Sequence, residues 1–295
     1  MRCIIITTIL EYLNELLQDQ NIPDNYKKEM NNDRENLLGI INKIQDLPIP
    51  TPYFGGSRGK KTMIKESYDL DIVLYFPETT NYSIENIYDK VARYLGSSNY
   101  SIMTKNAAIR VLKRENYHID VVPAKRIKGS EDSAFLWRNE VGKPLKTSVV
   151  QHIASIREFG RRDVIKLLKL WKVRYKIGFP SFILEQLIIR ALKNNLNLPL
   201  NNAIIEVLEF ISKNMETIRL EDPANTNNIL TDSISAYDKD IISKFAKWAL
   251  NEYDLTSLNG WKKLFNPIKL PQFYQATGVQ GKIKPNAPSP PRFGE

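Results

Sequence analysis

The sequence predicts an α+β protein in which a lobe of strands and helices is followed by a helical lobe. Two observations carry this prediction. Between residues 69 and 148 the apolar residues fall in short, largely alternating runs, as they do in strands. From about residue 148 they recur at helical spacing with few breaks. At 295 residues, 42% hydrophobic and 25% charged, the chain is long enough for one large core or for two abutting lobes.

The N-terminal region is expected to form two helices, over residues 4–19 and 24–46. Pro23 and Asp24 are helix-start signals, and apolar residues recur at helical spacing between residues 37 and 47. Two glutamates interrupt the apolar run of the first helix, so we interpret it as amphipathic rather than as a signal peptide. No run in the sequence approaches the roughly 20 apolar residues that a membrane-spanning helix needs.

Strands and one further helix are expected in the middle of the sequence. The prolines of "LPIPTPY" end the second helix, and "DLDIVLYF" (residues 69–76) has the pattern of a strand. An amphipathic helix is expected over residues 81–97. Residues 106–124 contain two strands joined at Glu115–Asn116, a hairpin by length and pattern, and residues 134–148 contain a second, weaker hairpin signal.

The second half of the sequence is expected to be helical. The helical segments cover residues 148–160, 161–176, 180–195, 201–215 and 237–253. The last stretch, residues 280–295, is rich in proline and lacks apolar periodicity, so a flexible tail is expected there. We therefore divide the chain into a first lobe (1–147), a helical lobe (148–268) and a flexible tail (269–295).

Composition restricts the function classes. The formal charge of +9 indicates an anionic partner, for which nucleotides, nucleic acid and acidic membrane surfaces all qualify. The single Cys3 excludes a disulfide framework, and two histidines, His118 and His152, argue against a zinc site. This composition suits the reducing cytoplasm.

Asp69 and Asp71 are the first candidate functional residues. Two residues apart on a strand, their side chains project from the same face. Two carboxylates held so close repel one another, and both ionise readily only if a cation lies between them. Mg²⁺ fits, because it takes oxygen ligands and is commonly held by one or two carboxylates together with substrate phosphates. A solvent-facing pair on an exposed strand is the alternative.

Asp120 strengthens the metal hypothesis. It lies in "YHIDVVPA", on a strand whose hairpin partner can lie next to residues 69–76, and Ile119 and Val121 would point to the opposite face. A third acid brought to the pair completes a two-metal site. One ion there lowers the pKa of an attacking hydroxyl, and the other binds a triphosphate and neutralises the leaving group. Asp120 would hold only the nucleophile-side ion.

The glycines of "GGSRGKKT" suggest a phosphate-binding loop. Gly55 and Gly56 let the backbone approach a ligand closely, and the amides of this turn, with the Ser57 hydroxyl, can donate to phosphate oxygens. A short helix from Arg58 would add its dipole. A Gly-Gly-Ser turn followed by Asp-x-Asp and then by a lone Asp on a distant strand is far more specific than the turn alone, which is usually an ordinary turn.

This order of motifs resembles the DNA polymerase β-like nucleotidyltransferase superfamily, over about residues 35–268. Within it, the sequence is similar to the branch that holds the 2′-5′-oligoadenylate synthetases, cyclic GMP–AMP synthase and the bacterial CD-NTases of anti-phage CBASS systems. "GGSRGKKT" is similar to the Gly-Ser-x-x-Lys-Gly-Thr loop of that family, "DLDI" to its Asp-x-Asp, and "IDVVPA" to its third-acid strand. "VIKLLKLWKVRY", "PSFILEQL", "LEDPANTNNI" and "GWKKLFNP" resemble its later signatures in the same order. Lys61 and Tyr68 depart from it: a glycine is usual at the first position, and a serine is frequent at the second.

The resemblance implies a polymerase β-like nucleotidyltransferase lobe with a mixed sheet, a C-terminal helical lobe, and a long N-terminal helix that braces both. It also implies that Lys169 and Ser181 bind the triphosphate together with Gly56 and Ser57. An ammonium group is a strong phosphate partner. From the residues alone, Lys169 would otherwise lie on a solvated helix face, and Ser181 would be a helix N-cap beside Pro180.

Two further groups of residues are expected to be structural. Asp222 and Asn225 of "EDPANTNN" favour a turn, and the resemblance places them near the nucleotide cleft, where they would brace the loop. Trp171, Trp248 and Trp261 are most simply core aromatics.

Three functions are compatible with these features. The first is a CD-NTase that joins nucleoside triphosphates into a cyclic di- or trinucleotide with two Mg²⁺ or Mn²⁺ ions per site. The second is a linear oligonucleotide synthetase or an RNA or tRNA nucleotidyltransferase, and the third is a catalytically silent nucleotide-binding partner. No zinc-binding insertion is visible, so a nucleic-acid activator is not expected. Some bacterial relatives are regulated through their C-termini, so a regulatory protein could bind the tail; a plain unstructured end is the simpler alternative.

Overall fold

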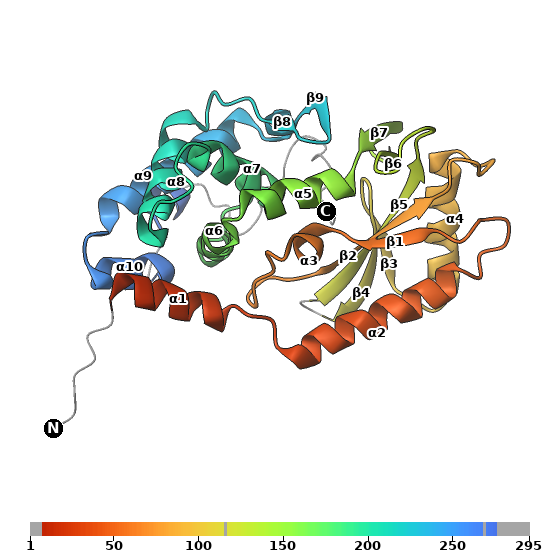
Figure 1. The fold of residues 1–295 in the computed structure, drawn as a ribbon, viewed down its shortest axis with the longest axis horizontal. Coiled ribbons are helices and arrows are strands. Elements are labelled where there is room, and N and C mark those ends of the chain that lie inside the picture. The colour runs from red at the N-terminus through yellow and green to blue at the C-terminus, as the bar shows by residue number, and fades with distance from the viewer. Residues whose placement is uncertain (1–7, 115–116, 268–269, 276–295) are drawn as a thin grey trace.

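The computed structural model describes residues 8–114, 117–267 and 270–275, which form two lobes lying side by side (Figure 1). We call them the sheet lobe and the helical lobe. The flexible tail expected over 269–295 begins too early, because Gln272–Gln275 form a short helix and Tyr274 is buried in the helical-lobe core. The Pro-rich residues 280–295, and with them the regulatory partner expected for the tail, lie outside the described residues. Within those residues, no helix combines the length and the apolar character that crossing a membrane requires.

The sheet lobe is built on a seven-stranded mixed sheet, which confirms the predicted α+β class. Neighbouring strands follow the order β1-β2-β5-β4-β3, and β6 joins β5 to β7. The β2–β5 pair is parallel and the other pairs are antiparallel. The strands are β1 (Thr51–Phe54), β2 (Leu70–Phe76), β3 (Ile102–Thr104), β4 (Ile109–Arg114), β5 (Tyr117–Arg126), β6 (Ala134–Arg138) and β7 (Lys143–Thr147).

One expected pairing is wrong. The sequence suggested that β4, the hairpin partner of β5, would lie beside residues 69–76. Instead β5 itself lies beside β2, and β4 lies on its other side. All residues of β2 and most of β5 are buried, and strands covered on both faces take central positions in a sheet. The turn expected at residues 115–116 lies outside the described residues.

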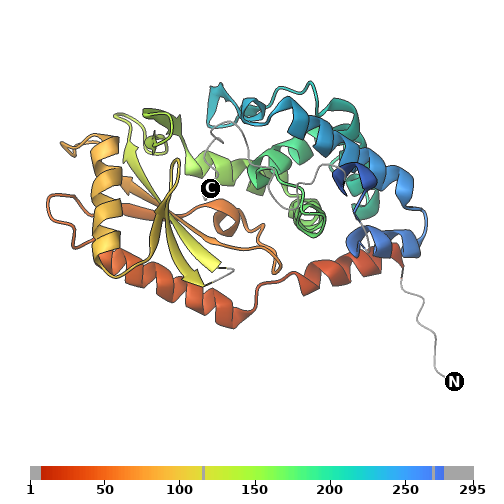
Figure 2. The ribbon, with the colours of Figure 1, turned by 180° about the vertical axis from the view of Figure 1, so that it is seen from behind.

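The two faces of the sheet have different coverings. One face packs against α2 (Asp24–Ile41) and α4 (Ile84–Ser97), with Ile72 and Val121 in their shared core (Figures 1 and 2). On the other face Val73 and Val122 pack against Val149, at the start of α5 (Val149–Phe159). Because side chains alternate along a strand, Asp71 and Asp120 share this second face with Val73 and Val122.

The helical lobe follows from residue 149. Its elements are α5, α6 (Arg162–Arg174), α7 (Ser181–Leu192), α8 (Leu200–Asn214), the hairpin of β8 (Glu221–Asp222) and β9 (Asn225–Ile229), the 3₁₀ helix η1 (Leu230–Ser233), α9 (Ala236–Glu252), α10 (Leu258–Phe265) and α11 (Gln272–Gln275). Trp171 and Trp261 are buried in its core, and Trp248 packs against that core, as expected.

The described N-terminal residues form two helices, as expected, but not the one long helix that was expected to brace both lobes. Helix α1 (Ile9–Asp19) buries Leu13 in the helical lobe, whereas α2 buries Met30 in the sheet lobe. The chain breaks between them because Pro23 precedes α2 and cannot continue a helix from α1. Helix α1 begins at Ile9, since Thr8 forms a capping box with Glu11, and α2 ends at Ile41 rather than at residue 46.

Candidate functional site

A narrow cavity of about 110 Å³ lies where the two lobes meet. Of the site residues predicted from the sequence, all but Asp120 line it. The lining residues are Gly56, Ser57, Lys60, Ser67, Asp69, Asp71, Lys169, Lys172, Ser181, Phe182 and Glu185. Residues more than a hundred positions apart in the sequence therefore meet in one place.

The glycine loop lies directly against the acids. The Gly55 N–H donates to the Asp71 backbone oxygen at 2.9 Å. Gly56 has a positive φ of 42°, and a Cβ at this position would overlap the Asp71 carboxylate. Glycine is required here for both reasons. The helix expected from Arg58 begins earlier, at Gly56, as the short α3 (Gly56–Lys60), which brings Ser57 to the cavity.

The three aspartates come together through the strand register. Asp69 immediately precedes β2, and Asp71 lies within it, so both side chains leave the same face. In the parallel β2–β5 pair, Asp71 lies directly opposite Asp120. The pairing that corrects the sequence prediction is therefore the one that places the third acid beside the Asp-x-Asp pair.

Asp120 has a partner that the sequence interpretation missed. Arg110 lies opposite it in the β4–β5 pair and donates from Nε to Asp120 Oδ1 at 2.8 Å and from Nη2 to Oδ2 at 2.7 Å. His118 Nε2 lies 3.3 Å from Asp69 Oδ2 and 3.7 Å from Asp120 Oδ2. The hairpin expected to turn at Glu115–Asn116 would place Val111 opposite Asp120; a register shift between Leu112 and Arg114 brings Arg110 there instead, so the sequence pattern did not reveal this partner.

The electrostatic environment separates the three carboxyl groups. Burial, Asp69 and Asp120 together raise the pKa of Asp71 well above its ordinary value. Burial also raises the pKa of Asp120, although Arg110 opposes this effect. Burial acts in the same direction on Asp69, but His118, Lys169 and Arg110 outweigh it, and the pKa of Asp69 is lowered. Asp71 therefore has the greatest need of an additional positive charge.

Asp71 has the character of a cation ligand. Its side chain is 2% exposed, and its Oδ1 atom has no hydrogen-bond partner among the described residues. Unpaired buried carboxylate oxygens are costly, and oxygen ligands are those that Mg²⁺ takes. The Asp69–Asp71 pair therefore fits such an ion. In the described part of the chain no three acidic, His or Cys side chains are arranged to hold a metal as they stand, and Arg110 contacts both oxygens of Asp120.

Two lysines of α6 supply positive charge opposite the acids. Lys169 is 5% exposed and donates from Nζ to the Thr62 backbone oxygen at 3.0 Å. Lys172, which the sequence interpretation did not assign, donates to Ser181 Oγ at 3.3 Å. Pro180 is the N-cap of α7 and the Ser181 side chain does not cap it, so the alternative of an N-cap serine is wrong.

Lys60 and Glu185 also were not assigned from the sequence. Lys60 Nζ lies 2.7 Å from Glu185 Oε2, and both side chains are almost fully buried. Thr62 Oγ1 donates to Glu185 Oε1 at 3.2 Å, and the Lys60 ammonium lies 4.4 Å from the ring centroid of Phe182. This ion pair joins the glycine loop of the sheet lobe to α7 of the helical lobe. Both residues belong to quoted motifs, "GGSRGKKT" and "PSFILEQL", so the motifs were the available signal.

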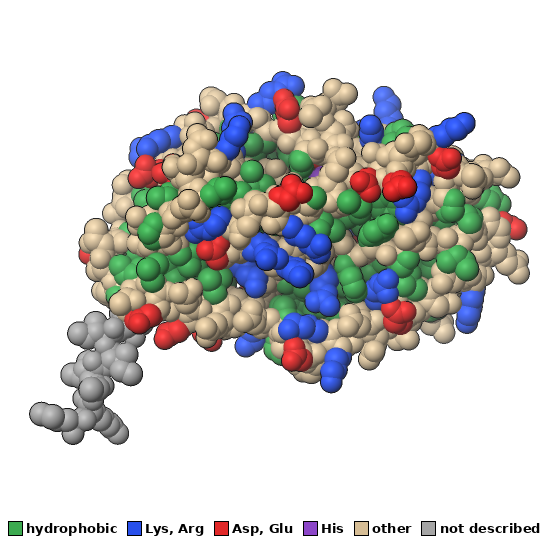
Figure 3. Space-filling view, viewed as in Figure 1, with side chains coloured by type: hydrophobic (Ala, Val, Ile, Leu, Met, Phe, Trp, Pro, Cys, Tyr) green, Lys and Arg blue, Asp and Glu red, His purple; other side chains and the backbone are tan. Residues whose placement is uncertain are grey.

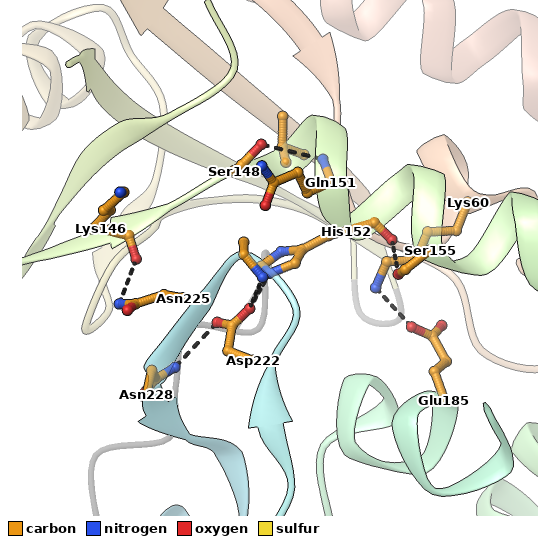
Figure 4. A network of polar contacts seen from close by, with 12 residues as sticks. Lys60, Lys146, Ser148, Gln151, His152, Ser155, Glu185, Asp222, Asn225 and Asn228 are labelled. Atoms are coloured by element: carbon orange, nitrogen blue, oxygen red, sulfur yellow. Dashed lines mark hydrogen bonds and ion pairs between the residues drawn. The ribbon is translucent and has the colours of Figure 1, made fainter. Parts of the chain in front are cut away.

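A second network lies outside the cavity, around the β8–β9 hairpin of the helical lobe (Figure 4). His152 on α5 and Asp222 on the β8–β9 hairpin point toward one another, with His152 Nε2 2.6 Å from Asp222 Oδ1. Asp222 also accepts from the Ala224 N–H and from Asn228, and Asn225 donates to the Lys146 backbone oxygen. Asp222 and Asn225 thus brace the hairpin, as expected, without lining the cavity.

The structure locates Lys61 and Tyr68, the two residues that depart from the sequence pattern described above. Lys61 follows α3 in the left-handed region, with a φ of 60°. Tyr68 packs between Tyr26 and Tyr117, with ring centroids 5.9 Å apart in each case, and its hydroxyl lies 3.4 Å from Arg114 Nη2. Neither residue lines the cavity.

Several solved structures share this fold. CdnG, a CD-NTase of Bradyrhizobium diazoefficiens in complex with GTP, has a TM-score of 0.72 at 14% identity, covering 89% of this chain and 97% of CdnG. CdnC of E. coli, with ATP, has a TM-score of 0.63 at 18% identity, covering 88% and 97%. DncV of Vibrio cholerae, a cyclic AMP-GMP synthase in complex with a linear intermediate, has a TM-score of 0.61 at 14% identity, covering 87% and 94%. No family model and no curated protein matches the sequence.

Proposed function

We propose that this chain, which has the fold of the CD-NTases, is a metal-dependent nucleotidyltransferase that joins nucleoside triphosphates and releases pyrophosphate. One observation carries the proposal. Asp71 is buried against Asp69 and Asp120 with one oxygen unpartnered, in a cavity whose other wall holds Lys169 and Lys172. Clustered carboxylates facing ammonium groups suit a triphosphate with its divalent cation.

In the proposed reaction, the acceptor hydroxyl gives up its proton to water and its oxygen forms a bond to the α-phosphorus of the donor, while the bond from that phosphorus to the oxygen of the β-phosphate breaks and pyrophosphate leaves. Two Mg²⁺ or Mn²⁺ ions per site would lower the pKa of the acceptor hydroxyl and neutralise the charge of the leaving pyrophosphate. Asp69 and Asp71 would hold the ions, and Asp120 the nucleophile-side one. Arg110 keeps the Asp120 carboxylate oriented toward the pair.

The donor triphosphate is placed by residues from both lobes. Ser57 and the backbone of Gly56 would donate to its oxygens, and Lys169, Lys172 and Ser181 would neutralise and orient it. Rate enhancement would come mostly from alignment and from this charge complementarity. The Lys60–Glu185 pair fixes the distance between the loop and α7, so it positions the two halves of the phosphate site.

We further propose that the product is a cyclic di- or trinucleotide second messenger, as in anti-phage signalling. Solved neighbours support this proposal, since DncV is a cyclic AMP-GMP synthase and CdnE of Elizabethkingia meningoseptica a cyclic dinucleotide synthase. A linear oligonucleotide synthetase or an RNA nucleotidyltransferase is the alternative. Labelled triphosphates, singly and in pairs, distinguish them: a cyclic product resists phosphatase, whereas a linear one loses its terminal phosphates. RNA binding that weakens steeply with salt would favour the alternative.

The double substitution Asp69→Asn and Asp71→Asn tests the metal-site assignment. We expect pyrophosphate release with Mg²⁺ or Mn²⁺ to fall by at least about a thousandfold, because the charges that hold the ions are gone. The circular dichroism spectrum should stay unchanged. A matched control, Asp24→Asn with Asp240→Asn, removes two exposed carboxylates that pair with neighbouring lysines and should keep full activity. An active Asp69/Asp71 variant would exclude the assignment.

A further inference from the structure

A second and larger cavity lies on the other side of α3. It has a volume of about 680 Å³, within the range of about 300–1,000 Å³ typical of small-molecule sites. Strand β1 and helices α3 and α5 form its walls, so we call it the α3–α5 pocket. It shares no lining residue with the cavity between the lobes: Gly56, Ser57 and Lys60 face one side of α3, and Arg58, Gly59 and Lys61 face the other.

The pocket has an apolar wall and a cationic edge. Tyr53, Val150 and Ile153 contribute apolar surface from the α5 side of the sheet, whereas the ring of Phe54, which pairs with Ile72, packs toward α2 and α4. Its charged lining residues are Arg58, Lys61, Arg157 and a single acid, Glu158. Figure 3 shows Lys and Arg side chains gathered near the middle of this face, in the region where Figure 1 draws α3. Cations next to aromatic and apolar surface suit an anionic ligand that carries a ring.

Two of the cations are held in place by the protein. Arg157 donates from Nη2 to the Gly59 backbone oxygen at 2.9 Å. The Arg58 guanidinium lies 5.2 Å from the ring centroid of Phe54. The backbone at Gly59 is closely packed, because a Cβ there would overlap the Phe54 backbone oxygen and crowd Ile153. The pocket edge is therefore preorganised.

Lys61 is the observation that points to a ligand. It adopts left-handed backbone, with a φ of 60°, a conformation that is unfavourable for a residue other than glycine. Its side chain is exposed and has no hydrogen-bond or ion-pair partner within the described residues. The Lys61 ammonium group therefore does not stabilise the fold through any contact within the described residues. It is free to form a charge-assisted hydrogen bond with an anion in the pocket.

We propose that the α3–α5 pocket binds a small organic anion that combines an aromatic or apolar ring with at least two negative charges. The ring packs on Tyr53 and Ile153, and the charged groups pair with Lys61 and Arg157. A single acid against three cations leaves an excess of positive charge, which is why more than one negative group is required. This inference concerns binding alone and does not depend on the proposed transferase activity.

The test uses the fluorescent probe bis-ANS, which carries aromatic rings and two sulfonates. We expect saturable binding with one strong site, and about fivefold weaker binding in Lys61→Gly, since a partly exposed ion pair contributes up to about 1 kcal/mol. Lys176→Gly is the matched control: Lys176 also has a positive φ, of 55°, but does not line the pocket, so its affinity should equal that of the unchanged protein. Equal affinities of the Lys61→Gly variant and the control would overturn the proposal.

A second variant and two competitors complete the test. Ala154→Trp fills the pocket with a bulky ring and should abolish the strong site, with circular dichroism reporting that the protein is folded. A saturating non-hydrolysable ATP analogue with Mg²⁺ should leave bis-ANS bound; displacement would place the probe in the other cavity and overturn the proposal. Displacement by a 20-base-pair RNA duplex, weakening steeply with salt, would identify a nucleic-acid surface and overturn it as well.

Discussion

Two buried aspartates, Asp71 and Asp222, show how differently the same side chain is treated in two parts of this molecule. Asp71 is 2% exposed and Asp222 is 3% exposed. Asp222 accepts hydrogen bonds from His152, the Ala224 N–H and Asn228. Asp71 has two acids as neighbours and an oxygen without a partner among the described residues. The two aspartates are therefore buried to nearly the same degree and differ in the number of hydrogen-bond donors that contact their carboxylate groups.

The pKa directions express this contrast. Burial raises the pKa of both carboxyls, but the His152 contact and the other donors outweigh it at Asp222, so its pKa lies below the ordinary value. At Asp71 the nearby acids add to the effect of burial, and the pKa lies well above it. The Asp222 network that braces the β8–β9 hairpin thus has its full set of donors, whereas the carboxyl groups of the cavity need a cation from outside.

Asp222→Ala is the substitution expected to have the largest effect on stability. It removes the acceptor of three hydrogen bonds and leaves the buried His152 without this contact, so we expect the free energy of unfolding to fall by about 3 kcal/mol. Urea unfolding followed by circular dichroism measures it. The control Asp240→Ala breaks an exposed pair with Lys244 and should change the value by at most about 0.5 kcal/mol. A similarly small effect of Asp222→Ala would show that Asp222 does not stabilise the packing of the β8–β9 hairpin on α5.

Arg110→Gln is expected to cost about 2 kcal/mol when measured in EDTA. It removes the guanidinium that satisfies both oxygens of Asp120, whose side chain is 0% exposed. If Arg110 supplies the charge that an ion supplies in the working site, Mg²⁺ should restore part of this loss. We therefore expect a larger Mg²⁺-dependent rise in unfolding temperature in Arg110→Gln than in the unchanged protein.

The control for this prediction is Arg93→Gln. Arg93 donates to a backbone oxygen on the exposed surface of α4, far from the acids in the fold. It should respond to Mg²⁺ as the unchanged protein does. The same Mg²⁺ response in Arg110→Gln and in this control would mean that Asp120 does not present its oxygens to an ion.

The sequence was sufficient for the parts of the site that are encoded locally. Side-chain alternation placed Asp69 and Asp71 on one face, and the Gly-Gly-Ser turn preceded a strand whose acids it now contacts. The helical segments after residue 148 also followed from periodicity, because most of their apolar residues pack into one core; α6 and α7 are buried on nearly all sides.

Tertiary pairing accounts for what the sequence did not reveal. Arg110 becomes a partner of Asp120 only through the β4–β5 register, and the choice of β5 rather than β4 as neighbour of β2 depends on which strand is buried on both faces. Lys60 and Glu185 lie 125 positions apart, and no periodic pattern connects them. The two N-terminal helices were expected, but the sequence did not reveal that α1 packs on one lobe and α2 on the other, because the local signals of a helix do not show which core it joins.

Asp71→Asn should stabilise the metal-free protein by about 1 kcal/mol. The amide keeps the size of the side chain while removing a charge that the folded protein buries without compensation. Urea unfolding in EDTA measures the gain, and Asp240→Asn, which neutralises an exposed carboxylate, is the control. Mg²⁺ should no longer stabilise the Asp71→Asn variant. Without Mg²⁺ the variant should therefore be more stable than the unchanged protein, and Mg²⁺ should reduce or reverse this difference by stabilising only the unchanged protein.

The smallest expected effect is the pH dependence of the stability gained by Asp71→Asn, which should differ in direction from the pH dependence that Asp222 causes. Because the folded-state pKa of Asp71 is raised, the folded protein retains a proton that the unfolded chain releases above about pH 4, so metal-free stability falls as the pH rises toward that pKa. The gain from Asp71→Asn should therefore be absent near pH 3 and grow over this window. Asp222 makes stability change with pH in the opposite direction: its lowered pKa gives stability that is present above about pH 4 and lost as the pH falls through the folded-state pKa.

Unfolding in EDTA from pH 3 to 8, with Asp71→Asn and Asp222→Asn measured beside the unchanged protein, checks both directions. A gain from Asp71→Asn that is constant with pH would mean that its carboxyl is already compensated in the folded protein, and the contrast between the two regions would fail.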